Sequence, residues 1–133
     1  MKNNKVLITG SSGFIGSHVA DALEEEGYQV VLFDMTPSNY KTESQGEFIG
    51  DILSPDDIEA AMEGCDAVYH CAAQADIGAS SDMPTRTITA NIIGTQNVLE
   101  VARKHRVNRF MFASTIYVYS NSCFVIVLHQ ECP

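Results

Sequence analysis

A glycine loop near the start of the chain constrains the fold more than any other feature. It follows the apolar residues 6–8, which carry no charge and predict a strand buried on both faces of a parallel sheet. Glycines then recur at every third position, namely at Gly10, Gly13 and Gly16. In such a loop the first glycine permits a sharp turn, the second lets a phosphate approach the backbone, and the third lets helix and strand pack closely.

A helical pattern begins within this loop. The N–H groups of its first turn, around Phe14 and Ile15, would face a phosphate, and the helix dipole would add to the attraction. We expect this helix over about residues 13–26, with Gly27 as its stop. Its predicted inward face consists of Ile15, Val19, Ala20 and Leu23. On the glycines alone, an ordinary strand-to-helix turn is as good an interpretation as a phosphate cradle.

An acidic residue at a suitable distance favours the phosphate cradle. Residues 29–33 predict a second buried strand, and Asp34 follows it directly, 18 residues beyond Gly16. A carboxylate at this offset can accept hydrogen bonds from the 2′- and 3′-hydroxyls of an adenosine ribose. It would repel a 2′-phosphate, and no arginine follows to offset the repulsion, so we expect NAD rather than NADP. A solvated acid at a strand end is the alternative.

The next segments continue the alternation of strands and helices. We expect a loop over residues 37–45 and a short strand over residues 47–50, which leads into Asp51 and Ile52. Ser54 and Pro55 then have the pattern of a helix cap and first helical position, and this helix should stop at Gly64. Its predicted inward residues are Ile58, Ala61 and Met62.

The second half of the chain repeats the pattern. A fourth strand is expected over residues 67–70, followed by a turn of small residues that includes Ala72 and Ala73. After a loop over residues 77–84, a long helix is expected over about residues 85–105. Its residues at helical spacing are Ile88, Ile92, Thr95, Val98, Leu99 and Ala102. Asn91, a poor helix former, would either hydrogen-bond the loop after a neighbouring strand or lie exposed.

A fifth strand over residues 109–114 completes the set, and it leads into Thr115. Five strands alternating with helices predict an α/β fold: a doubly wound parallel sheet of order 3-2-1-4-5. A ligand crevice is expected where strands 1 and 4 diverge, at the carboxyl edge of the sheet. The strand ends that should open on that edge are Gly10, Asp34, Asp51, Ala72 and Thr115. Their convergence makes the phosphate cradle the better interpretation.

Composition narrows the class of partner. The chain has 133 residues and a formal net charge of −9, which argues against nucleic acid or an anionic membrane as the main partner. Polar residues break the apolar stretch over residues 110–128, and glycines and serines interrupt the first apolar run. We therefore expect no membrane span and no signal peptide, and a cytoplasmic protein.

The cysteines and histidines indicate no metal site. The four cysteines have no C-x-x-C spacing and no metal-like arrangement with the four histidines. We expect them to be reduced thiols rather than disulfides. They are Cys65, Cys71, Cys123 and Cys132.

An ordered set of motifs resembles the extended short-chain dehydrogenase/reductase family, in particular its NAD-dependent sugar-nucleotide epimerases and dehydratases. The resemblance covers residues 5 to about 120. The matching pieces are T-G-x-x-G-x-x-G at 9–16, Asp34, Asp51-Ile52, His70-Cys71-Ala72-Ala73, Asn91-x-x-Gly94-Thr95, and Ser114-Thr115 ahead of Val118-Tyr119. The resemblance implies an NAD-binding Rossmann domain over residues 1–120.

The resemblance also implies a role for each matching position. The glycine loop would hold the pyrophosphate of NAD, through Gly10, Gly13, Phe14, Ile15 and Gly16. Asp34 would hold the adenosine ribose, and Asp51 with Ile52 would contact the adenine. Ala72 and Ala73 would line the nicotinamide ribose, while Asn91 would steady the pocket.

At the end of the fifth strand, the resemblance implies that Ser114 belongs to the cofactor-binding set. Thr115 would be catalytic, with its hydroxyl bonded to the sugar hydroxyl that is oxidised. The substrate would be a sugar nucleotide.

One part of the family's machinery has no match. Family members carry a Tyr-x-x-x-Lys pair in which the tyrosine, its pKa lowered by the lysine, accepts the proton. The last tyrosine here is Tyr119 and the last lysine is Lys104, so the pair is absent, and we recognise no motif of the family in residues 121–133. We therefore expect a truncated product, incomplete at its C-terminal end, that holds NAD but turns over poorly. The alternatives are a non-catalytic dinucleotide-binding or interaction module, or a fragment that folds poorly.

Overall fold

The computed structural model describes residues 4–115. The predicted tail over residues 121–133 lies outside this range, as do Tyr119 and the cysteines Cys123 and Cys132. Within the range, no helix has both the length and the apolar character needed to cross a membrane. The cytoplasmic location stays a prediction.

Five parallel strands form one sheet, in the order β3-β2-β1-β4-β5. This confirms the predicted doubly wound topology. The strands are β1 (Lys5–Thr9), β2 (Gln29–Asp34), β3 (Gly46–Ile49), β4 (Ala67–His70) and β5 (Arg109–Phe112). Because β5 ends at Phe112, Ser114 and Thr115 follow the strand rather than extend it.

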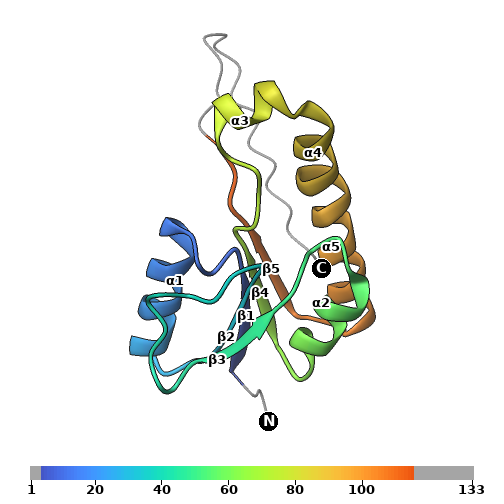
Figure 1. The fold of residues 1–133 in the computed structure, drawn as a ribbon. Helices are drawn as coiled ribbons and strands as arrows, with labels where there is room; N and C mark the ends of the chain where they lie inside the picture. Colours follow the sequence, from blue (N-terminus) through green and yellow to red (C-terminus); the bar gives the residue numbers. More distant parts are fainter. Residues whose placement is uncertain (1–3, 116–133) are drawn as a thin grey trace, which may run out of the picture.

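Helices cover both faces of the sheet (Figure 1). Helix α1 (Phe14–Glu25) packs on one face, and α2 (Pro55–Met62) and α5 (Thr95–Lys104) lie together on the other. As predicted, Ser54 caps α2, since its hydroxyl accepts a hydrogen bond from the Asp57 N–H at 3.4 Å. Both layers therefore leave the carboxyl ends of the strands open at one edge.

Two apolar clusters hold these layers together, one on each face. The larger joins the sheet to α2 and α5, and its most buried members include Leu7, Ile58, Met62, Val68 and Val98. The smaller lies under α1 and consists of Val6, Ile8, Ala20, Val30 and Leu32. The alternation of the first strand between the two clusters shows that it is buried on both faces, as its uncharged sequence predicts.

The predicted loop over residues 77–84 is wrong. The chain forms a short helix there, α3 (Ile77–Asp82), in which Ser80 donates its N–H and its hydroxyl to the Asp76 carbonyl, at 2.9 and 2.6 Å. Helix α4 (Pro84–Ile88) follows directly. Residues 77–84 carry no apolar periodicity, so the sequence pattern offers no sign of a helix held by local bonds.

The long helix predicted over residues 85–105 contains a π-helical segment, η1 (Thr89–Gly94), between α4 and α5. A π turn inserts an extra residue and rotates the following face. The uniform inward stripe is therefore wrong in part: Val98 and Ala102 are buried, but Ile88 is 56%, Ile92 60% and Leu99 46% exposed.

Helix α1 departs from its predicted inward face at one residue. Ala20 is buried and Val19 and Leu23 pack partly against the smaller cluster, as expected. Ile15 is 56% exposed, because it lies in the first turn, above the sheet edge rather than over the sheet. It lines the cavity described next, so its predicted place in the glycine loop is unaffected.

Candidate functional site

A cavity of about 970 Å³ opens at the carboxyl edge of the sheet. Its volume lies at the upper end of the range usual for cofactor pockets. The structure brings most of the predicted site residues to its wall, namely Gly10, Gly13, Phe14, Ile15, Gly16, Asp34, Asp51, Ile52, Ala72 and Ala73. Asn91, Ser114 and Thr115 are not among the lining residues, and Ser114 and Thr115 are exposed beyond β5.

The glycine loop is shaped by close backbone contacts. Gly10 has φ of +71° and donates its N–H to the Phe33 carbonyl at 2.9 Å. A Cβ on Gly10 would lie 2.5 Å from the Ala72 nitrogen, and one on Gly16 would collide with the Gly10 carbonyl. Gly10 therefore allows the sharp turn and Gly16 the close packing of α1, as predicted, and Gly10 also allows the turn after β4 to come close.

Gly13 presents the start of α1 to the cavity. It is the N-cap of the helix and has no side chain to cap the first N–H groups. It is exposed, and its N–H donates to the Gly10 carbonyl at 3.2 Å. The positive end of α1 therefore points into a space without a Cβ in the way, which is the cradle that a pyrophosphate requires.

Asp34 is fixed against this loop at the end of β2. Its Oδ2 accepts a hydrogen bond from the Ser12 N–H at 3.0 Å. The Ser12 hydroxyl donates to the Thr36 carbonyl at 2.7 Å, so the chain on both sides of the aspartate is tied to the loop. The carboxylate is thus half-buried in the cavity wall in a set orientation.

Asp51 and Ile52 form the wall beyond β3. Asp51 accepts the Leu53 N–H at 2.9 Å and donates its own N–H to the Asp57 carboxylate at 3.1 Å. The Ile52 side chain is buried in the larger cluster, against the position where Gly94 lacks a Cβ. Ile52 can therefore offer the cavity little apolar surface, and its carbonyl is taken by Asn97 Nδ2 at 3.1 Å.

The amide of Asn91 makes the hydrogen bonds predicted for it. Its Oδ1 accepts the Gln74 N–H at 2.7 Å, and its Nδ2 donates to the Gln74 carbonyl at 3.1 Å. This paired contact joins η1 to the turn after β4, and the alternative of an exposed asparagine is wrong. Asn91 therefore acts behind the cavity wall, on the segment that carries Ala72 and Ala73.

Two features of the site were missed by the sequence reasoning. Arg86 on α4 lines the cavity, where the other charged lining residues are Asp34, Asp51 and Asp82. The position of Arg86 depends on the two short helices α3 and α4, which the sequence pattern did not predict as separate helices. His70 is 1% exposed and hydrogen-bonded at both ring nitrogens, and its signal was present in the motif as the polar end of an apolar strand.

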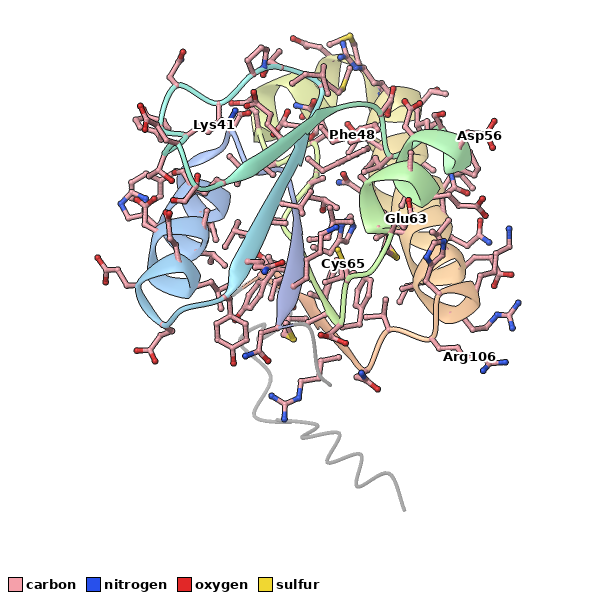
Figure 2. All side chains as sticks on the ribbon, turned by 90° about the horizontal axis from the view of Figure 1, so that it is seen from below. Lys41, Phe48, Asp56, Glu63, Cys65 and Arg106 are labelled. Carbon is pink, nitrogen blue, oxygen red and sulfur yellow. The ribbon has the colours of Figure 1, made fainter. Side chains whose placement is uncertain are left out.

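The described cysteines have no features of reactive thiols. Both Cys65 and Cys71 are free. Burial is the main cause that raises the pKa of Cys65 to about 11, and burial also raises the pKa of Cys71, so both stay protonated at neutral pH. Figure 2 shows Cys65 inside the molecule between the sheet and α2, while Arg106 lies at the periphery.

The residues present fit a dinucleotide. The cradle at Gly13 suits a pyrophosphate, Asp34 suits a ribose diol, and the cavity volume suits both halves of the cofactor. Comparison with known families agrees, since the model of the NAD-dependent epimerase/dehydratase family matches residues 6–130. The chain belongs to this family.

NAD is the cofactor of the epimerase/dehydratase family, and its solved members share the fold. The UDP-glucose 4-epimerase of Thermus thermophilus, solved in complex with NAD, superposes with a TM-score of 0.79 and 32% identity. The alignment covers 84% of this chain and 37% of that one. The Rossmann architecture is therefore shared with an NAD-bound relative.

Relatives of known activity differ in what they act on. A UDP-glucose 4-epimerase of Pisum sativum is 34% identical, over 88% of this chain and 38% of its own length. A 2-alkyl-3-oxoalkanoate reductase of Stenotrophomonas maltophilia is 36% identical, over 84% of this chain and 33% of its own length. The chain thus spans between a third and two fifths of the length of these relatives.

Proposed function

We propose that this chain is the NAD-binding portion of a sugar-nucleotide epimerase or dehydratase. The observation that carries the proposal is the glycine cradle at Gly13 beside a fixed carboxylate at Asp34, inside a cavity large enough for the cofactor. The epimerases among the relatives support the sugar nucleotide as substrate. Bound NAD would supply the hydride acceptor.

In this proposal, different residues of the chain bind different parts of NAD. The amides at the start of α1, at Phe14 and Ile15, hold the pyrophosphate. Asp34 accepts hydrogen bonds from the hydroxyls of the adenosine ribose. Asp51 and the backbone at Ile52 border the adenine. Because the Ile52 side chain is buried in the larger cluster, the backbone of Ile52 rather than its side chain would border the adenine.

The nicotinamide half lies along the turn after β4. Ala72 and Ala73 leave room for its ribose, while Asn91 holds the turn through Gln74. Ser114 and Thr115 follow β5 at the same edge. There the Thr115 hydroxyl would bond the substrate hydroxyl, whose oxygen would lose a proton while its carbon would lose a hydride to NAD. No Tyr-x-x-x-Lys pair occurs in the 133 residues, so we expect slow turnover from this chain alone.

The cofactor-binding groups at Gly13 and Asp34 also suit a second candidate function. A chain that binds NAD without turnover could act as a dinucleotide-binding module that controls a partner. The discriminating observation is a partner whose affinity for this chain changes with the NAD concentration.

Calorimetry with NAD and NADP, followed by an absorbance assay, tests the proposal. We expect NAD to bind and NADP to bind at least about tenfold more weakly, because Asp34 repels a 2′-phosphate. Added UDP-glucose should then yield little or no NADH. Equal affinity for both cofactors, or no binding by a folded sample, would overturn the proposed site.

A further inference from the structure

A buried histidine lies behind the cavity, at the carboxyl end of β4. In the sheet register, His70 pairs with Thr9 on one side and with Phe112 on the other. Parallel neighbours in register point to the same face, so these side chains form one row under η1 and α5. The row runs directly beneath the glycine loop, which begins at the residue after Thr9.

Both ring nitrogens of His70 are hydrogen-bonded. Nδ1 lies 2.6 Å from the Thr9 hydroxyl, and Nε2 lies 2.9 Å from the hydroxyl of Thr95, the first residue of α5. A neutral imidazole has one donor and one acceptor, and a hydroxyl can serve as either, so both contacts are satisfied at once. The ring thus bridges β1 and α5.

The Thr9 hydroxyl carries this bridge to the cavity wall. It also accepts the Ala72 N–H at 3.4 Å, and the Thr9 carbonyl accepts the Cys71 N–H at 3.0 Å. Ala72 is the residue against which Gly10 packs too closely to allow a Cβ. The orientation of Thr9 therefore sets how the glycine loop and the Ala72 turn meet.

Two aromatic rings lie beside the imidazole ring of His70. Its centroid lies 5.9 Å from those of Phe110 and Phe112. A leucine could occupy similar volume but would leave the hydroxyls of Thr9 and Thr95 without their buried partner. A core of purely apolar residues would fill the space without fixing the loop.

We propose that His70 is a positioning residue for the NAD site. By bonding Thr9 and Thr95 through its two nitrogens, it holds the glycine loop, the Ala72 turn and the start of α5 in the arrangement that receives the cofactor. This inference rests on the proposed function, since it assigns a task within the same site. His70 itself does not line the cavity.

The test compares His70→Leu with Val30→Ala. Val30 is buried in β2 and does not line the cavity, so its truncation lowers stability without touching the network. With both variants folded, we expect NAD affinity measured by calorimetry to fall about tenfold for His70→Leu and less than about twofold for Val30→Ala. The amide of His70→Gln offers a donor and an acceptor, so this variant should recover part of the lost NAD affinity. If the leucine variant does not fold, His70→Gln takes its place in the comparison with Val30→Ala.

Hydrogen exchange without cofactor provides a second readout. The Ala72 amide should exchange faster in His70→Leu than in Val30→Ala, when the two are compared under conditions that give them equal free energies of unfolding. Equal NAD affinity in the folded His70 and Val30 variants would overturn the positioning role, as would equal exchange at Ala72. If the unsubstituted chain binds no NAD, the proposed function fails, while the exchange comparison still decides whether His70 holds the turn.

Discussion

At the scale of single residues, the polar groups of this site are held by the backbone before any ligand arrives. The Ser12 N–H orients Asp34, and the Gln74 backbone orients Asn91. Such preorganisation lowers the ordering cost that binding must overcome. The site is therefore expected to respond to changes of single side chains in ways that depend on their partners.

Replacing Asp34 by alanine should weaken NAD binding and narrow the preference over NADP. The carboxylate is the acceptor proposed for the ribose hydroxyls, and its charge is what disfavours a 2′-phosphate. We expect NAD affinity to fall about tenfold or more, since a hydrogen bond to a charged group contributes about 1.5–3 kcal/mol. Calorimetry with both cofactors measures the two effects.

Asp56→Ala is the matched control, because Asp56 is an exposed acid on α2 that does not line the cavity. It removes the same charge and should leave both affinities unchanged. A cofactor preference in Asp34→Ala that equals that of the unsubstituted chain would remove the ribose role from this residue.

His70 should make the stability of the fold depend on pH. Burial lowers its pKa from 6.5 to about 4, so the folded chain resists protonation that the unfolded chain accepts. The free energy of unfolding should be fully retained above pH 6.5 and decline as the pH falls toward 4, by up to about 3 kcal/mol. Urea unfolding at several pH values measures this decline.

The contribution of His70 is isolated by the same series on His70→Gln. Carboxylates titrate in the acid part of this range in both chains, so only the difference between the two profiles is assigned to the histidine. Parallel profiles between pH 7 and pH 4.5 would show that His70 does not carry the effect.

At the scale of elements, sequence pattern predicted what depends on local chemistry. The glycine turn, the Ser54 cap and the inward residues of α2 follow from rules about single turns, and the structure confirms them. The helix at Ile77–Asp82 and the π turn at Thr89–Gly94 escaped prediction. The first has no apolar period, and the second carries Asn91, whose hydrogen bonds to Gln74 are a tertiary contact that a local pattern does not show.

Close packing of α1 on β1 should make Gly16 intolerant of a side chain. A Cβ there would run into the Gly10 carbonyl, and α1 would have to move away from the loop. We expect Gly16→Ala to lower the free energy of unfolding by at least about 1–3 kcal/mol, as overpacking does, and to abolish detectable NAD binding. Urea unfolding measures the first quantity and calorimetry the second. A free energy of unfolding and an NAD affinity that both equal those of the unsubstituted chain would contradict this prediction.

The clamp between η1 and the turn after β4 gives a prediction about a longer segment. Asn91→Leu removes two hydrogen bonds and leaves the half-buried Gln74 backbone without these partners. We expect a loss of about 1–3 kcal/mol in stability and faster amide exchange at Gln74. Gln96→Leu, an exposed change nearby on α5, should affect neither quantity.

At the scale of the whole molecule, the sheet topology explains why the place of the cavity could be predicted from the sequence. Parallel strands place their carboxyl ends on one edge, so residues from Gly10 to Ala73 meet there although they are far apart in the chain. The pattern placed His70 at the end of the fourth strand. Its hydrogen bonds, and the place of Arg86 on the cavity wall, could not be predicted, because they depend on how the strands, α4 and α5 pack at that edge. Ser114 and Thr115 keep their predicted roles only as proposals.

The same topology separates the proposed site from a second hollow. That hollow, of about 410 Å³, lies at the opposite edge of the sheet and is lined by residues that include Lys5, Asp66 and Arg109. A dinucleotide that bound by charge alone would have basic groups available there. A cofactor held by the glycine loop and Asp34 must bind at the carboxyl edge instead.

Backbone amide chemical shifts recorded during an NAD titration test that claim most directly. We predict that the largest changes fall on Gly13, Phe14 and Ile15 and on the segment around Asp34, with little change near Asp66 and Asn108. In Gly16→Ala, added NAD should no longer bring these shift changes to saturation. Shifts that cluster around Asp66 and Arg109, or a folded chain whose glycine-loop amides do not respond to NAD, would contradict binding at the carboxyl edge.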